Sequence, residues 1–66
     1  MPYVLVRKGK LGDECMVFVY YMNRLVEKIK CEETPKLDFE IPKEMKKVVA
    51  NMAKLLREEE EGRVYW

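Results

Sequence analysis

The chain has 66 residues, of which 48% are hydrophobic and 38% are charged, and its net charge at pH 7 is +1. A chain this short holds one domain at most, and its hydrophobic content excludes a disordered tail. The near-zero charge is unlike the strongly basic balance of most nucleic-acid-binding domains. Because a domain of this size buries only roughly 60% of its unfolded surface, we expect a cross-link or a partner copy to add to its stability.

The first half of the chain has the pattern of three strands. Residues 3–8 are rich in β-branched and apolar side chains, which favour a strand. Residues 8–13 contain two glycines and are predicted to form a loop. Two further strands are predicted at about 14–22 and 25–32, folded back on each other around Asn23.

Two registers are open for this hairpin. A turn centred on Asn23 pairs Phe18 with Lys28, whereas a tighter turn at Asn23-Arg24 pairs Phe18 with Ile29. Both are tolerable because the first strand is apolar on both of its faces, and we favour the first. It places aromatic and lysine side chains together on one face of the sheet, namely Phe18, Tyr20, Lys28 and Lys30.

The two cysteines have alternative interpretations. In the favoured register Cys15 lies opposite Cys31, so a cross-strand disulfide closing a loop of about 15 residues is one hypothesis. Two buried free thiols, as is usual in cytosolic proteins, are the other. Two cysteines without a histidine leave a zinc ion half-ligated, which argues against a metal site.

The second half predicts a short strand, a helix and a tail. Residues 37–41 alternate apolar and acidic side chains, as expected of an edge strand. Pro42 suits the first turn of a helix that should run over about 42–61, with Gly62 as its left-handed cap. Residues 62–66 are left as a short tail. At 100° steps the apolar positions of the helix form one stripe within an arc of about 100°, formed by Ile41, Met45, Val48, Val49, Met52 and Leu56.

These elements predict an α+β fold of one domain. An antiparallel sheet of three to four strands, arranged as a β-meander, is followed by one C-terminal amphipathic helix packed on one sheet face. The opposite face of the sheet then lacks a cover within the chain.

The predicted helix carries its charges in an order that opposes its dipole. Residues 43–57 hold five bases and one acid, and residues 58–61 are all acidic, whereas the dipole favours acids at the start. One hypothesis is an antiparallel pair of helices from two copies, with an apolar interface of Met45, Val49, Met52 and Leu56. The other is a solvated surface with local Lys54–Glu58 and Arg57–Glu61 pairs.

Two further surfaces are candidates for binding. The face bearing Phe18, Tyr20, Lys28 and Lys30 has the aromatic and basic character that holds single-stranded nucleic acid, although it also suits a dimer interface. The tail ends in Tyr65 and Trp66, residue types that dominate interface hot spots. This tail either folds back over the core or docks in a partner.

The absent residue types restrict the function. The chain contains no His and no Ser, so the common catalytic triads and histidine-based metal sites are excluded. The composition, rich in Lys and Glu, resembles that of hyperthermophile proteins. With no apolar run of about 18 residues and no signal-peptide pattern, we predict a cytoplasmic protein with no membrane segment.

We therefore predict a small non-enzymatic protein-interaction module or regulatory subunit that self-associates. No cofactor, metal or small-molecule substrate is expected. The alternative is a nucleic-acid-binding regulator that uses the aromatic and lysine-bearing sheet face.

Overall fold

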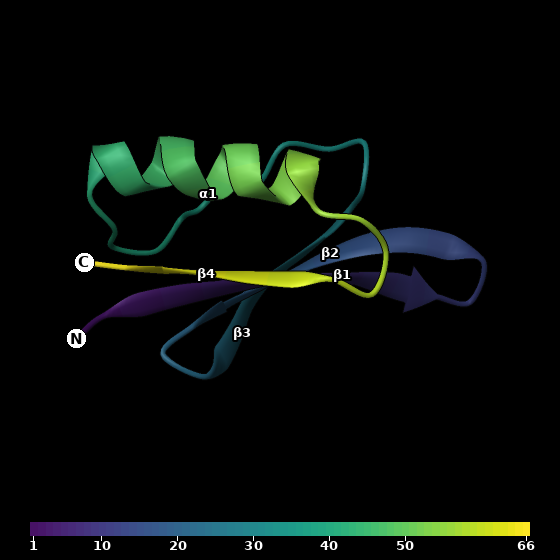
Figure 1. The fold of residues 1–66 in the computed structure, drawn as a ribbon, viewed down its shortest axis with the longest axis horizontal. Coiled ribbons are helices and arrows are strands. Elements are labelled where there is room, and N and C mark those ends of the chain that lie inside the picture. Colours follow the sequence, from purple (N-terminus) through teal and green to yellow (C-terminus); the bar gives the residue numbers. More distant parts are fainter.

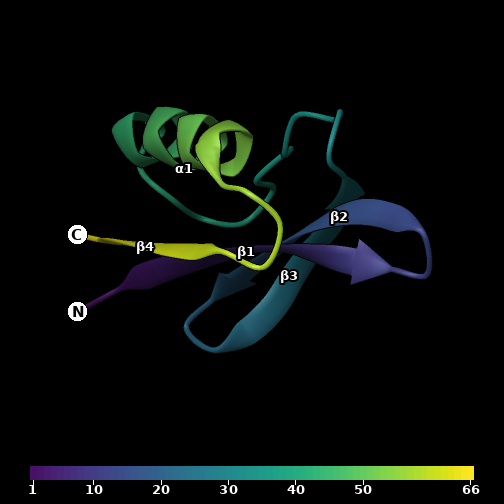
Figure 2. The ribbon, with the colours of Figure 1, turned by 45° about the vertical axis from the view of Figure 1, so that its right-hand side comes forward.

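A computed structural model describes all residues from Met1 to Trp66. It confirms the α+β class: one antiparallel sheet of four strands carries a single helix on one face (Figures 1 and 2). The strand order across the sheet is β3-β2-β1-β4. The elements in chain order are β1 (Tyr3–Leu11), β2 (Glu14–Tyr21), β3 (Arg24–Lys30), α1 (Lys43–Leu55) and β4 (Glu61–Tyr65).

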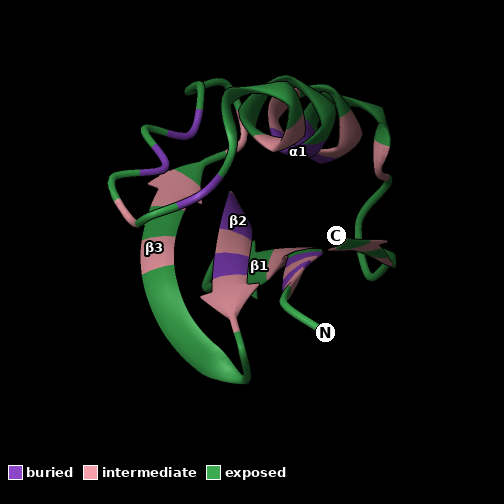
Figure 3. Cartoon of the chain, turned by 90° about the vertical axis from the view of Figure 1, so that its left-hand side faces the viewer, coloured by how far each residue is buried: buried purple, intermediate pink, exposed green.

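The core lies between α1 and the sheet. Four valines of β1 and β2, alternating along their strands, are at most 1% exposed, and Val49 of α1 is fully buried against them. Figure 3 marks buried positions on the strands, on α1 and in the segment between β3 and α1. The four valines are Val4, Val6, Val17 and Val19.

The β2–β3 hairpin follows the favoured register only in part. Phe18 pairs with Lys28 as predicted, but a bulge next to Val19 shifts the pairing, so that Tyr20 meets Leu25. The turn is Met22-Asn23, and both residues have positive φ angles of 50° and 68°. A two-residue turn of this kind matches the twist of the strands. This turn shifts the pairing by one residue relative to a turn centred on Asn23, and the extra residue is taken up by the bulge.

The prediction that the helix ends the chain is wrong. Residues 62–66, expected as a tail, contribute to a fourth strand that runs antiparallel to β1, with Val64 opposite Val4. The N–H of Trp66 donates to the carbonyl of Pro2 at 3.2 Å. The tail therefore folds back, because the open edge of β1 offers backbone partners that no other segment of the chain uses.

The helix also ends earlier than predicted. It stops at Leu55, since Leu56 has extended backbone angles (φ −68°, ψ 143°). The Lys8 ammonium donates to the Leu56 carbonyl at 2.8 Å, which places a positive charge at the negative end of the helix dipole. Glu60 accepts a hydrogen bond from the N–H of Arg57 and stabilises the turn that follows.

Residues 37–41 do not form the predicted edge strand. Leu37 has a φ angle of 55°, which breaks an extended conformation. Both Leu37 and Ile41 are buried in the core, and the segment crosses from β3 to α1. The Glu27 carboxylate accepts hydrogen bonds from the N–H groups of Lys36 and Leu37, at 2.7 and 2.8 Å.

Replacing Glu27 should test whether its two hydrogen bonds to residues 36 and 37 hold this segment in place. We expect Glu27→Ala to lower the free energy of unfolding by about 2 kcal/mol, because two backbone N–H groups lose a charged acceptor. The exposed Glu32→Ala variant is the matched control. Urea denaturation followed by circular dichroism measures both. Equal stability of the two variants would contradict the anchoring role.

No helix of this chain is both long enough and apolar enough to cross a bilayer.

Candidate functional site

The face of the sheet turned away from α1 is the principal candidate site, and we call it the outer face. Side chains alternate along each strand, so the register assigns its members: Leu5 lies opposite Tyr20, and Arg7 opposite Phe18. On the other side of β1, Tyr3 lies opposite Tyr65. Nothing in the chain covers this face (Figure 2). The total accessible surface is 4775 Å², slightly above the roughly 4,400 Å² expected for this mass.

Aromatic rings dominate the outer face. Tyr3 and Tyr65 have ring centroids 5.7 Å apart, and 51% of Tyr65 is exposed. Phe18 and Tyr20 are half-buried on the neighbouring strand β2. Met16 is only 7% exposed although it lies outside the main core cluster. The outer face thus exposes part of each of these rings while it buries Met16.

Basic side chains stand among these rings. Arg63 lies over the ring of Tyr3, with its guanidinium carbon 5.7 Å from the centroid, a cation–π geometry. A hydrogen bond to Tyr65 raises the pKa of Arg63 further above its already high ordinary value. Lys28, opposite Phe18, is exposed.

Two carboxylates offset part of this charge. Arg7 lies 3.7 Å from Glu61, and Lys30 lies 4.0 Å from Glu14. All four side chains are more than half exposed, so each pair contributes little to stability and is easily exchanged for another anion. With Lys28 and Arg63 added, the outer face holds four bases against two acids.

The structure brings together the four residues predicted to share a face. Phe18, Tyr20, Lys28 and Lys30 all lie on the outer face, as the pairing of Phe18 with Lys28 and of Met16 with Lys30 requires. Alternation within residues 3–8 was the available signal for Tyr3, Leu5 and Arg7, whereas Arg63 could be placed only once β4 was known.

The two aromatic residues of the tail separate. Tyr65 lies on the outer face, but Trp66 lies on the helix side, where its ring stacks on Tyr21 with centroids 6.1 Å apart. Trp66 packs against the core cluster. Tyr65 and Trp66 therefore lie on opposite sides of the sheet, because successive strand residues point to opposite faces.

The residues predicted to form a helix-pair interface pack against the protein's own core. Val49 is buried in the core, and Met45, Met52 and Leu56 pack against it. The charge argument fails as well, because the acidic residues 58–61 lie outside α1. Glu58 instead lies 3.6 Å from Lys10, so neither the Lys54–Glu58 nor the Arg57–Glu61 pair is formed.

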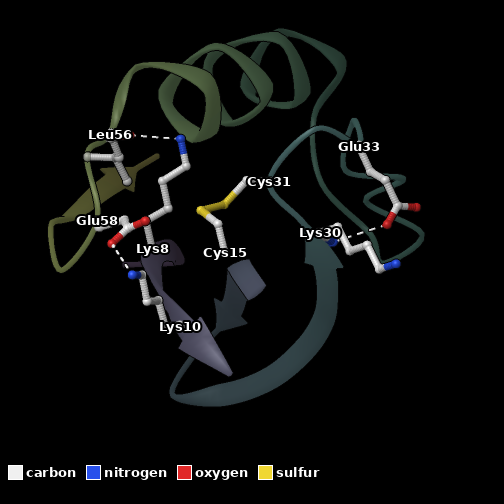
Figure 4. The surroundings of a disulfide bond; sticks show 8 residues. All are labelled: Lys8, Lys10, Cys15, Lys30, Cys31, Glu33, Leu56 and Glu58. Carbon is white, nitrogen blue, oxygen red and sulfur yellow. Dashed lines mark hydrogen bonds and ion pairs between the residues drawn. A yellow bond between two sulfur atoms is a disulfide. The ribbon is translucent and has the colours of Figure 1, made fainter. Parts of the chain in front are cut away.

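Cys15 and Cys31 form a disulfide (Figure 4). Their Cα atoms are 5.4 Å apart, and the bond ties the start of β2 to the residue after β3. The free-thiol interpretation is therefore wrong. No group of three or more His, Cys, Asp or Glu side chains is placed to hold a metal ion.

No protein-family model, curated protein or solved structure matches the chain.

Proposed function

We propose that the protein is a non-enzymatic binding module whose outer face holds single-stranded nucleic acid. One observation carries this proposal: Phe18 and Tyr20 are exposed in part on the same sheet face as Arg7, Lys28 and Lys30. Aromatic rings stack on unpaired bases while nearby cations hold the phosphates. The outer face therefore presents both groups to an extended chain.

The spacing of the rings suits successive bases. Phe18 and Tyr20 are two residues apart on β2, which is about 6.6 Å along a strand. That separation leaves each ring available to a base of its own. The four basic side chains of the outer face lie to either side of β2, on β1, β3 and β4. A strand of nucleic acid running along β2 therefore meets cations on both of its flanks.

The charge balance sets the strength of binding. Each phosphate neutralised on a single strand contributes about −0.7 to the slope of log K against log salt. Lys28 and Arg63 are free of carboxylates within 4.0 Å, whereas Arg7 and Lys30 have acidic neighbours. We expect a slope of about −1.4 if two of the basic side chains each neutralise a phosphate, and about −2.8 if all four do. Binding is thus modest and sensitive to salt.

A protein-binding role is the second candidate. The outer face is partly apolar, and rings with basic neighbours also occur in protein interfaces. Two copies stacked through their outer faces would, however, set two surfaces of net positive charge against each other, each with four basic and two acidic side chains. Self-association through this face is opposed by that repulsion.

The charges provide the first test. Fluorescence anisotropy would follow labelled single strands of about 15 nucleotides, of DNA and of RNA, and a duplex, at several salt concentrations. We expect the Lys28→Glu/Lys30→Glu variant to bind single strands more weakly by on the order of tenfold at low salt. The same charge change on the helix, Lys46→Glu/Lys47→Glu, is the control.

Flat titrations of the unmodified protein at low salt would discard the proposal. Equal losses in the two variants would also contradict it, since they would show that net charge alone governs binding.

A further inference from the structure

The free edge of β4 is the first part of a second candidate surface. The N–H of Lys8 donates to the Glu60 carbonyl and the N–H of Trp66 donates to the Pro2 carbonyl, so the even-numbered residues of this segment face β1. In an antiparallel pair the alternate residues point their N–H and C=O groups the other way. The backbone groups of Glu61, Arg63 and Tyr65 therefore face solvent and are open to a further strand.

An apolar ridge on α1 is the second part. It consists of Val48, Met52 and Leu55, and Leu55 is 82% exposed while Val48 is 44% exposed. These residues lie at i, i+4 and i+7, on one side of the helix. They line a shallow groove with Leu56, Arg57 and Glu60.

The ridge lies on the β4 side of the helix. Met52 packs on Gly62 so closely that a Cβ atom at Gly62 would be 2.5 Å from the Met52 sulfur. The helix makes its main strand contacts with β1 and β4, and Figure 1 shows it running along them. An open strand edge and an exposed apolar ridge thus lie next to each other on one side of the molecule.

We propose that a second copy of the chain docks on this side, with the two β4 strands paired antiparallel across a two-fold axis. Paired strands are about 4.8 Å apart. A helix centred between β1 and β4 then lies about 10 Å from its symmetry mate, close to the 8–10 Å at which helices pack. A single two-fold rotation therefore pairs the two β4 edges and also brings the two apolar ridges into contact above them.

The charges beside the ridge are complementary in this arrangement. In an antiparallel pair of helices the first turn of one copy, which carries Glu44, lies next to the C-terminal end of the other copy's ridge, where Arg57 lines the groove beside Leu55. Glu44 has no salt bridge within the chain, and the Arg57 side chain is 89% exposed with only a 4.0 Å contact to Glu60. The dimer offers both groups a partner. It also joins the two outer faces into one surface, although the dimer does not depend on nucleic-acid binding.

Sedimentation equilibrium tests the interface. We expect the unmodified protein to be a dimer at micromolar concentrations, and Leu55→Lys to raise its dissociation constant by at least about tenfold. Leu11→Lys, an exposed leucine at the far end of β1, is the matched control and should leave the dimer intact. Arg63→Pro should also dissociate the dimer, since it removes an outward N–H, while Arg63→Ala retains that group.

A charge exchange separates this interface from a general effect on folding. Glu44→Arg and Arg57→Glu should each weaken the dimer, and the double variant should recover at least half of the loss on a logarithmic scale. Circular dichroism confirms that each variant is folded. A monomer at all concentrations overturns the proposal, and so does a dimer that Leu55→Lys leaves unchanged.

Discussion

Reduction of the Cys15–Cys31 disulfide is expected to lower the free energy of unfolding by about 3 kcal/mol. The two cysteines are 16 positions apart, and opening the bond releases that loop in the unfolded chain, whose entropy then rises. The bond also ties β2 to the start of the segment that carries Leu37 and Ile41 into the core. For a domain of this size the loss corresponds to a fall in melting temperature of about 12–24 °C.

Thermal melts with and without reductant measure this effect. The Cys15→Ala/Cys31→Ala variant should melt near the temperature of the reduced protein and should not respond to reductant. This variant separates loss of the disulfide from other effects of the reducing agent. A reduced protein that melts within about 3 °C of the oxidised one would contradict the prediction, because it would correspond to less than 1 kcal/mol.

The double variant Phe18→Ala/Tyr20→Ala is expected to weaken single-strand binding by at least about 30-fold. Stacking on an aromatic side chain contributes about 1–3 kcal/mol per base, so two rings contribute about 2 kcal/mol or more, which is about 30-fold in affinity. Both rings are half-buried on the outer face, and neither belongs to the main core cluster. Anisotropy titrations at constant salt measure the change.

Conservative variants distinguish stacking from apolar contact in general. Phe18→Tyr and Tyr20→Phe retain both rings and should bind nearly as well as the unmodified protein. Leu5→Ala removes apolar area opposite Tyr20 on the same face and should cost much less than the loss of the rings. If Leu5→Ala weakens binding as much as the double variant, stacking does not account for the affinity.

Local patterns predicted a substantial part of this molecule. The β-branched stretches predicted β2, β3 and the first part of β1, although β1 continues to Leu11 through residues predicted to form a loop. Pro42 with the apolar stripe predicted where α1 begins. The positions of Phe18 and Lys28 predicted that they share a face. These features depend on alternation, helical periodicity and short turns, which neighbouring residues specify among themselves.

The remaining features depend on residues that are distant in sequence. The Lys8 ammonium donates a hydrogen bond to the Leu56 carbonyl at the end of the helix. Residues 61–65 pair with the edge of β1 as a fourth strand. The Glu27 carboxylate holds residues 36 and 37 out of the extended conformation. Such contacts form only when the chain has collapsed, because a lone segment has no open strand edge and no carboxylate of a neighbouring strand to meet. Periodicity within the chain therefore determined which residues share a face, and tertiary packing decided where the helix stops and that the last residues complete the sheet.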